Sequence, residues 1–282
     1  AMDAGFTKYT AGAGMIELRQ AICEKLKREN GLEYTPLEIL VSNGEKQSLY
    51  NACQVLFHKG DEVIIFVPYW VSFPEFVRLA DAEPVLIDTL PDKQFEADFN
   101  DLEKKITPAI KGVIINSPSN PSGRVEAVES LKEIEKIAIE QGTYILSDEV
   151  YKDLIYIREN YLIQGPHVVT INSFSKTYAM CGFRVGYLWS LDFQLVNDVI
   201  AIKTHTSMNT NILGQEMAFE ATKVPRKFID DQLKIWQERR DLLYAGLKDA
   251  GLDLWNPEGA FYMLPKIDNA ADFVWDMFIK YN

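Results

Sequence analysis

The chain has 282 residues, of which 47% are hydrophobic and 25% are charged, with a formal net charge of −12. This size and composition predict a globular protein of one large or two smaller domains, and the acidic balance without a basic stripe argues against a nucleic-acid partner. No apolar run is long enough for a membrane span, and residues 1–10 lack a signal-peptide pattern. The cysteines Cys23, Cys53 and Cys181 have no metal-ligand spacing, so we expect a reduced, cytoplasmic protein without a metal site.

The first half of the chain predicts alternating helices and strands. An amphipathic helix is predicted over residues 14–30. The apolar runs that follow are continuous, so both faces of each strand should be buried, as in a parallel sheet covered by helices. Alternation of this kind predicts an α/β domain. The predicted strands are 62–67, 84–88, 112–116, 143–147 and 168–172, and the helices between them include 73–81 and 129–141.

The pattern changes after about residue 212, where long helices dominate. The longest of these covers residues 228–251 and should end at Gly251, since glycine favours the left-handed conformation that closes a helix. Residues 259–267, GAFYMLPKI, then predict a strand. We therefore expect a large domain over residues 1–210, including the N-terminal helix, and a smaller α+β C-terminal domain over residues 211–282.

Polar side chains follow three of the predicted strands. Asn120 lies in SPSNPSG after the strand 112–116, and Asp148 and Tyr151 follow the strand 143–147. Ser173 and Lys176 follow the strand 168–172. Ligands of parallel α/β sheets bind outside the carboxyl ends of the strands. An amide, a carboxylate, a phenol and an amine should therefore meet at one edge of the sheet.

These groups suit an aromatic aldehyde with a basic ring nitrogen. The amine of Lys176 can form a Schiff base with an aldehyde. Asp148 can pair with a protonated ring nitrogen, and Trp70 can stack on a flat ring. Taken singly, each residue also has an ordinary explanation as a loop, cap or core residue, so the interpretation depends on their combination.

A phosphate site is predicted beside them. Ser173 and Arg184 can donate hydrogen bonds to a phosphate. The sequence NGEK (43–46) stands between a strand-like and a helix-like segment, where backbone N–H groups at a helix N-terminus bind anions. An aldehyde, a phosphate, a basic ring nitrogen and a planar ring together describe pyridoxal 5′-phosphate.

The segments SFSKTYAMCGFRVGY, NSPSNPSG, SDEVY, NGEKQ and PYWVSFPE resemble those of class I pyridoxal-phosphate aminotransferases of fold type I. The chain is most similar to the bacterial-type aspartate aminotransferase branch, from about Tyr9 to Leu264. The resemblance implies a mostly parallel central sheet flanked by helices, with a smaller α+β C-terminal domain. The implied activity is transfer of an amino group from an L-amino acid to a 2-oxo acid.

The resemblance also implies roles for the residues at the strand ends. Lys176 would form the Schiff base with the cofactor and later move the proton, and Asp148 would pair with the pyridine nitrogen. Tyr151 and Asn120 would hydrogen-bond the ring oxygen. Trp70 would stack on the ring, and both Trp70 and Asn120 would contact the substrate.

The phosphate contacts are implied in the same way. Ser173, Arg184 and the backbone of Gly44 and Glu45 would bind the phosphate. Tyr9 resembles a tyrosine that reaches the phosphate of a neighbouring subunit, so the active unit would be a homodimer. The resemblance further implies a cis peptide bond between Asn120 and Pro121.

Lys46 lies at the same helix start and is counted with the cofactor-binding residues. In this branch a basic residue at its position lies near the distal carboxylate of an acidic substrate. Lys46 therefore favours aspartate or glutamate as amino donor, with 2-oxoglutarate or oxaloacetate as partner. Some relatives also accept prephenate, and the sequence leaves that choice open.

Two family features have no counterpart between Ala1 and Asn282: the N-terminal arm and the C-terminal segment with the arginine that binds the substrate α-carboxylate. We expect both to lie outside the printed residues. Two alternatives stay open on the same fold: a lyase or synthase acting at Cβ or Cγ, and a non-catalytic effector-binding domain. The intact set Lys176, Asp148, Tyr151 and Arg184 favours an enzyme.

Overall fold

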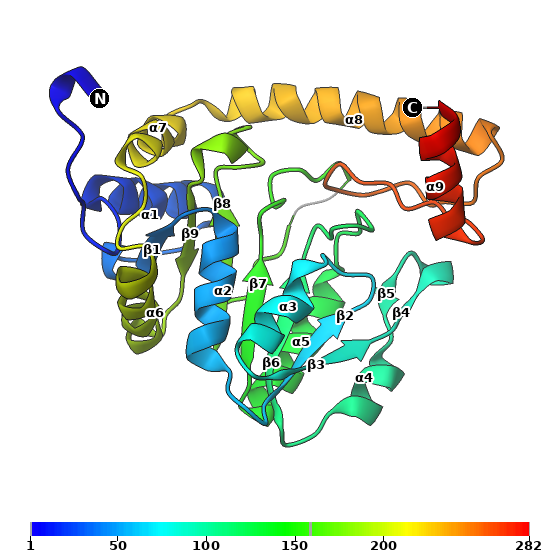
Figure 1. Ribbon diagram of the computed structural model, residues 1–282, viewed down its shortest axis with the longest axis horizontal. Helices are drawn as coiled ribbons and strands as arrows, with labels where there is room; N and C mark the ends of the chain where they lie inside the picture. Colours follow the sequence, from blue (N-terminus) through cyan, green and yellow to red (C-terminus); the bar gives the residue numbers. More distant parts are fainter. Residues whose placement is uncertain (1, 158–159, 282) are drawn as a thin grey trace.

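The computed structural model describes residues 2–157 and 160–281, within which a seven-stranded sheet forms the centre of the molecule (Figure 1). The strand order is β1–β9–β8–β7–β6–β2–β3. Strands from β8 to β3 pair in parallel, whereas β9 runs antiparallel to both β8 and β1. The strands are β1 (Ile39–Ser42), β2 (Glu62–Phe66), β3 (Glu83–Ile87), β6 (Ile110–Asn116), β7 (Tyr144–Asp148), β8 (Val168–Ser173) and β9 (Gly186–Trp189), with a separate pair of β4 (Thr89–Leu90) and β5 (Glu96–Ala97).

The α/β fold predicted from the sequence is confirmed. All five predicted strands form, each within two residues of the expected bounds. The continuous apolar runs of β2, β6, β7 and β8 are buried on both faces, whereas the edge strand β3 is partly exposed, contrary to the expectation for it. In β6, for example, Ile114 packs into one core cluster while Val113 and Ile115 pack into another. The short strand β9 was not predicted.

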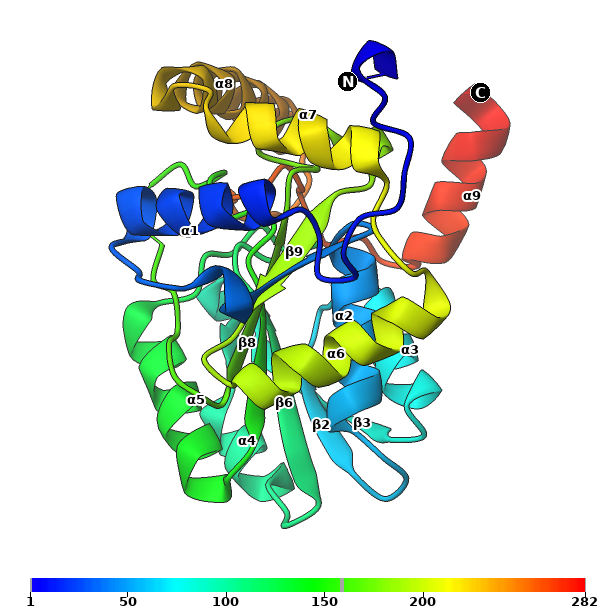
Figure 2. The same cartoon turned by 90° about the vertical axis from the view of Figure 1, so that its left-hand side faces the viewer.

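Helices cover both faces of this sheet (Figure 2). One face carries α2 (Glu45–Leu56), α3 (Ser72–Leu79) and α6 (Phe193–Thr206), whose apolar side chains form one core cluster with the sheet. The opposite face carries α5 (Val128–Gln141) over β6 and β7 and α4 (Phe99–Lys105) beside the edge strand β3. The same face carries α1 (Ile16–Asn30) with α7 (Ile212–Thr222) over β1 and β9. Short 3-10 helices lie at Met2–Ala4, Pro36–Glu38, Pro91–Lys93 and Cys181–Phe183.

The C-terminal part begins with α8 (Arg226–Asp249), which runs along one end of the sheet (Figure 1). Gly251 follows the C-cap Ala250 with a left-handed φ of +83°, as expected of a helix-terminating glycine. The last helix is α9 (Ala270–Tyr281). None of the helices described has both the length and the apolar character needed to cross a membrane.

The prediction of a strand over residues 259–267 is wrong. This segment forms only single bridges, Ile155 to Gly259 and Asp253 to Lys266. Ala260 has a left-handed φ of +55°, which interrupts the alternation that a strand requires. The N–H groups of Gly259 and Ala260 donate to the carbonyls of Gly123 and Leu154, which belong to loops and offer no continuous strand edge.

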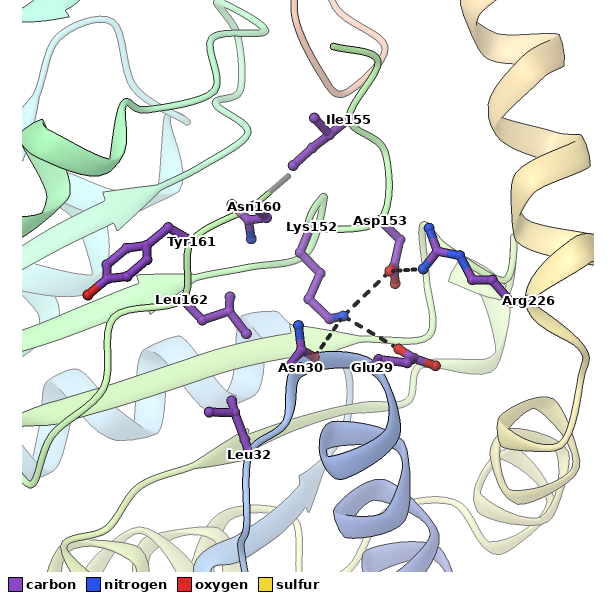
Figure 3. Close-up of a pocket in the computed structure, with 10 residues that line it drawn as sticks. All are labelled: Glu29, Asn30, Leu32, Lys152, Asp153, Ile155, Asn160, Tyr161, Leu162 and Arg226. Atoms are coloured by element: carbon purple, nitrogen blue, oxygen red, sulfur yellow. Dashed lines mark hydrogen bonds and ion pairs between the residues drawn. The ribbon is translucent and has the colours of Figure 1, made fainter. Parts of the chain in front are cut away.

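A buried group of charges links α1, the loop after β7 and the start of α8 (Figure 3). The Nζ of Lys152 lies 3.6 Å from a carboxylate oxygen of Glu29, and Asp153 accepts a 3.0 Å hydrogen bond from Arg226. Lys25 lies 3.8 Å from Asp153. Burial alone would raise the pKa of Asp153, but Lys152, Lys25 and Arg226 outweigh it and hold that pKa well below its usual range. The ionised carboxylate therefore stabilises the fold.

We expect Asp153→Asn to lower the free energy of unfolding by about 3 kcal/mol at pH 7, because it leaves buried cations without their partner. A depressed carboxyl pKa contributes stability above the unfolded value of 3.8, and that contribution is lost as the pH falls. The difference between variant and wild type should therefore shrink toward about pH 3 in urea unfolding measured across pH.

Asp231→Asn provides the control, because Asp231 pairs with Lys227 on the exposed face of α8. Its removal should change the unfolding midpoint little at any pH. An equal loss in both variants would contradict the structural role assigned to Asp153.

Candidate active site

A cavity of about 100 Å³ lies at the carboxyl ends of the parallel strands. Asn116 and Asp148 are the last residues of β6 and β7 and are paired in register. Lys176 follows the end of β8 by three residues. The structure thus brings the predicted amide, carboxylate, phenol and amine to one place. The cavity is lined by Glu45, Trp70, Asn116, Asn120, Asp148, Val150, Tyr151, Lys176 and Tyr262.

Asp148 is the most deeply buried charged group of this cavity, with 2% of its surface exposed. Burial raises the pKa of Asp148 well above its usual range, and the nearby carboxylate of Glu45 raises it further. A hydrogen bond from the N–H of Val150 and the charge of Lys176 act in the opposite direction. The site holds a carboxylate that lacks a full counter-charge and would be stabilised by a cationic ligand.

The amine of Lys176 faces aromatic rings. Its Nζ lies 5.5 Å from the ring centroid of Tyr151 and 5.4 Å from that of Phe261. Within the described residues it makes no hydrogen bond or ion pair. By contrast, the amine of Lys152 contacts carboxylates on two sides. Lys176 is therefore the amine available for chemistry.

Tyr151 belongs to a small hydroxyl network. Its Oη lies 2.5 Å from the Oη of Tyr262, which also accepts a 3.2 Å hydrogen bond from the Nδ2 of Asn120. Burial is the largest cause that raises the pKa of Tyr151, and the hydrogen bond with Tyr262 adds to it. Tyr151 therefore stays a neutral phenol that can donate a hydrogen bond into the cavity.

Sequence reasoning missed Tyr262 as a site residue. It lies in the segment predicted as a strand, and no strand end precedes it. Two glycines allow this segment to pack closely against the loop around residues 118–123. A Cβ on Gly259 would lie 2.7 Å from Pro118, and one on Gly123 would lie 2.6 Å from Pro257. The available signal was the pair of aromatic residues directly after Gly259 and Ala260.

The predicted phosphate residues also meet, next to the cavity. Gly44 is the N-cap of α2 with a φ of +77°, and a Cβ at this position would lie 2.3 Å from Nη2 of Arg184. A Cβ on Gly186 would lie 2.4 Å from the backbone N of Glu45. Only glycine permits these close approaches. The side chain of Ser173 donates a 2.9 Å hydrogen bond to the carboxylate of Glu45.

Of the remaining predicted site residues, Trp70 and Lys46 lie at the cavity wall or next to it, and Tyr9 does not line the cavity. Trp70 lines the cavity, and the Nζ of Lys46 lies over the Trp70 ring, 4.8 Å from its centroid. Lys46 itself is exposed and does not line the cavity. Tyr9 is 81% exposed and is not among the residues that line the cavity. The Asn120–Pro121 peptide bond is cis, as expected.

A larger cavity of about 590 Å³ surrounds the buried charges near Lys152 (Figure 3). It shares no lining residue with the first cavity. Figure 3 shows the Lys152 side chain directed toward Asn30, Glu29 and Asp153, so its amine is already engaged. The smaller cavity is therefore the candidate active site.

Comparison with known proteins gives consistent results. The chain matches the family described as aminotransferase class I and II over residues 1–281. It is 40% identical over 278 residues to an aspartate aminotransferase of Bacillus sp. strain YM-2, covering 96% of this chain and 71% of that protein. It is 38% identical over 270 residues to an aspartate/prephenate aminotransferase of Thermus thermophilus, covering 94% and 70%.

Solved structures agree with these relatives. The aspartate aminotransferase of Thermus thermophilus with maleate superposes with a TM-score of 0.91 at 38% identity, covering 94% of this chain and 71% of that one. An aromatic aminotransferase of Pyrococcus horikoshii gives a TM-score of 0.94 at 32% identity, covering 99% and 78%.

The burial of Asp148 leads to a stability prediction. Because the pKa of Asp148 is raised in the fold, its ionised form is disfavoured there, and stability is lost as the pH rises. Asp148→Asn should therefore raise the melting temperature of the ligand-free protein by a few degrees at pH 8, and the gain should shrink toward about pH 4. Differential scanning calorimetry across this range is the measurement.

Asp231→Asn, which removes an exposed carboxylate of the same kind, again serves as the control. A ligand-free Asp148→Asn protein that melts below wild type at pH 8 would show that the carboxylate stabilises the empty site instead.

Proposed function

The chain belongs to the class I and II aminotransferases, which use pyridoxal phosphate, and we propose that it transfers the amino group of L-aspartate to 2-oxoglutarate with Lys176 as the cofactor-bearing residue. The observation that carries this proposal is that the amine of Lys176, which forms no ion pair with any residue the structure describes, shares one cavity at the strand ends with the buried carboxylate of Asp148. Amino-group transfer needs both groups, since one holds the cofactor and the other controls its charge.

The residues of the cavity fit this cofactor. The buried, under-compensated carboxylate of Asp148 suits the protonated nitrogen of a pyridine ring, because a cation there would restore the charge balance. The close-packed backbone at Gly44 and the guanidinium of Arg184 suit a phosphate at the N-terminus of α2. Trp70 offers a ring face at the cavity wall.

Pyridoxal phosphate, when bound, supplies an electron sink for the bonds at the substrate α-carbon. Asp148 would hold the protonated ring nitrogen. The amine of Lys176 would be the attachment point for the aldehyde and would carry the proton at the substrate α-carbon. Tyr151 and Asn120 would donate hydrogen bonds to the ring oxygen, and Ser173 and the backbone N–H of Glu45 would hold the phosphate.

We further propose a homodimer in which Tyr9 reaches the phosphate of the neighbouring subunit. Its 81% exposure leaves its side chain free for such a contact. The aspartate preference is supported by the names of the Bacillus and Thermus relatives and by Lys46, whose amine lies over the Trp70 ring at the cavity wall. A cation at this position suits the distal carboxylate of a dicarboxylic substrate.

Absorbance spectroscopy of the pyridoxal-phosphate-loaded protein tests the reaction. The visible band of the bound cofactor should disappear on addition of L-aspartate and return with 2-oxoglutarate. Lys176→Ala should lose this band and reduce turnover by at least about a thousandfold, because it removes both the attachment point and the proton carrier.

Lys223→Ala is the control, because it removes an exposed lysine at the C-terminal end of α7. Its absorbance band and its turnover should equal those of the wild type. Normal turnover by Lys176→Ala would contradict the assignment. Ammonia release from the amino acid without any 2-oxo acid would instead indicate a lyase.

The substrate role of Lys46 is tested by Lys46→Met. The ratio of kcat/KM for aspartate over alanine should fall about tenfold, because a charged hydrogen bond to the distal carboxylate is lost. Lys46→Arg keeps the charge and should retain most of the preference. An unchanged ratio in Lys46→Met would remove Lys46 from substrate recognition.

A further inference from the structure

The side chain of Glu45 lies where its charge opposes the ligand that its own backbone is suited to bind. Glu45 is the first residue of α2, so its N–H points out of the helix N-terminus. Its carboxylate, however, turns into the cavity with Asp148 and Lys176 and accepts the hydrogen bond of Ser173. Glu45 thus places both its backbone N–H, a hydrogen-bond donor, and its negatively charged carboxylate near Ser173.

The hydrogen bond from Ser173 uses up a donor that a phosphate would need. A serine hydroxyl has a single proton to donate. In Ser173 that proton is directed to the Glu45 carboxylate at 2.9 Å, while the oxygen accepts from the N–H of Ser175 at 3.2 Å. A phosphate can receive this hydrogen bond from Ser173 only if the hydroxyl gives up its bond to the Glu45 carboxylate.

Among the residues described, no lysine or arginine forms an ion pair with the Glu45 carboxylate. Asp148 is a second carboxylate in the cavity, and Glu45 is one of the causes that raise its pKa. Lys176 faces the Tyr151 and Phe261 rings, and Arg184 lies against Gly44 and donates to the carbonyl of Cys181. A phosphate monoester with a charge of about −2 would therefore meet a like charge at close range.

We propose that Glu45 limits the affinity of the protein for pyridoxal phosphate, because its carboxylate competes with the phosphate for the Ser173 hydroxyl and repels it as a like charge. This inference rests on the proposed function. The Glu45 carboxylate competes with the phosphate group of the ligand for Ser173. It should not weaken the binding of a ligand that has no phosphate group.

Glu45→Gln tests the proposal by removing the charge and keeping the size of the side chain. Protein stripped of cofactor is titrated with pyridoxal phosphate and, separately, with pyridoxal, and binding is followed by visible absorbance and by quenching of tryptophan fluorescence. The dissociation constant for pyridoxal phosphate should fall by about tenfold or more, since like charges in a partly buried site repel strongly. The constant for pyridoxal should change by less than about twofold.

Glu129→Gln is the matched control, because Glu129 is also an acidic residue in the first turn of a helix, α5, and is exposed. It reproduces any general effect of removing a helix N-terminal charge and should bind both ligands as wild type does. Glu45→Ala removes the hydrogen bond as well and should bind pyridoxal phosphate at least as tightly as Glu45→Gln.

Wild-type protein that binds pyridoxal phosphate, with Glu45→Gln and Glu45→Ala binding it equally or more weakly, would overturn this inference and leave the proposed function intact. An equal gain for pyridoxal would also overturn it, because the effect would not depend on the phosphate. Wild-type protein that binds no pyridoxal phosphate at all would overturn the proposed function, and this inference with it.

Discussion

The parallel, in-register pairing of β6, β7 and β8 is the constraint on which the site depends. Because β6 and β7 end at paired residues, Asn116 and Asp148 lie side by side, and the turn after β8 brings Lys176 next to them. Parallel strands direct all their carboxyl ends to one edge. Apolar side chains bury both faces of these strands, so the polar groups can act only at their ends.

We expect the carboxylates of this cavity to lower the stability of the ligand-free protein. Asp148 is buried with a raised pKa, and Glu45 adds a second carboxylate in the same cavity. The group around Asp153 differs, because Lys25, Lys152 and Arg226 outnumber the carboxylates of Asp153 and Glu29 and hold the pKa of Asp153 low. The carboxylate of Asp153 is thus paired with cations, whereas that of Asp148 lacks a full counter-charge, as is common for groups at active sites.

The C-terminal segment completes the site from outside the sheet. Tyr262 reaches Tyr151 across 111 residues of sequence, and Phe261 places its ring between Tyr151 and Trp236 of α8. Glycines at positions 123 and 259 allow the backbones to approach closely enough for this contact. The division of the chain near residue 210 stays a prediction, but the residues on both sides of it contribute to one cavity.

The sequence alone determined the α/β class, the five parallel strands and the identity of the groups at their ends, because burial patterns and turn residues are local properties. It also pointed to Asp148, Tyr151 and Lys176, since each comes shortly after the end of a predicted strand. Only the tertiary structure decided that residues 259–267 form a loop, that β9 lies between β8 and β1 and runs antiparallel to both, and that Tyr262 and the Glu45 carboxylate enter the cavity. These depend on contacts between distant segments and on the direction of a side chain, neither of which a local pattern encodes.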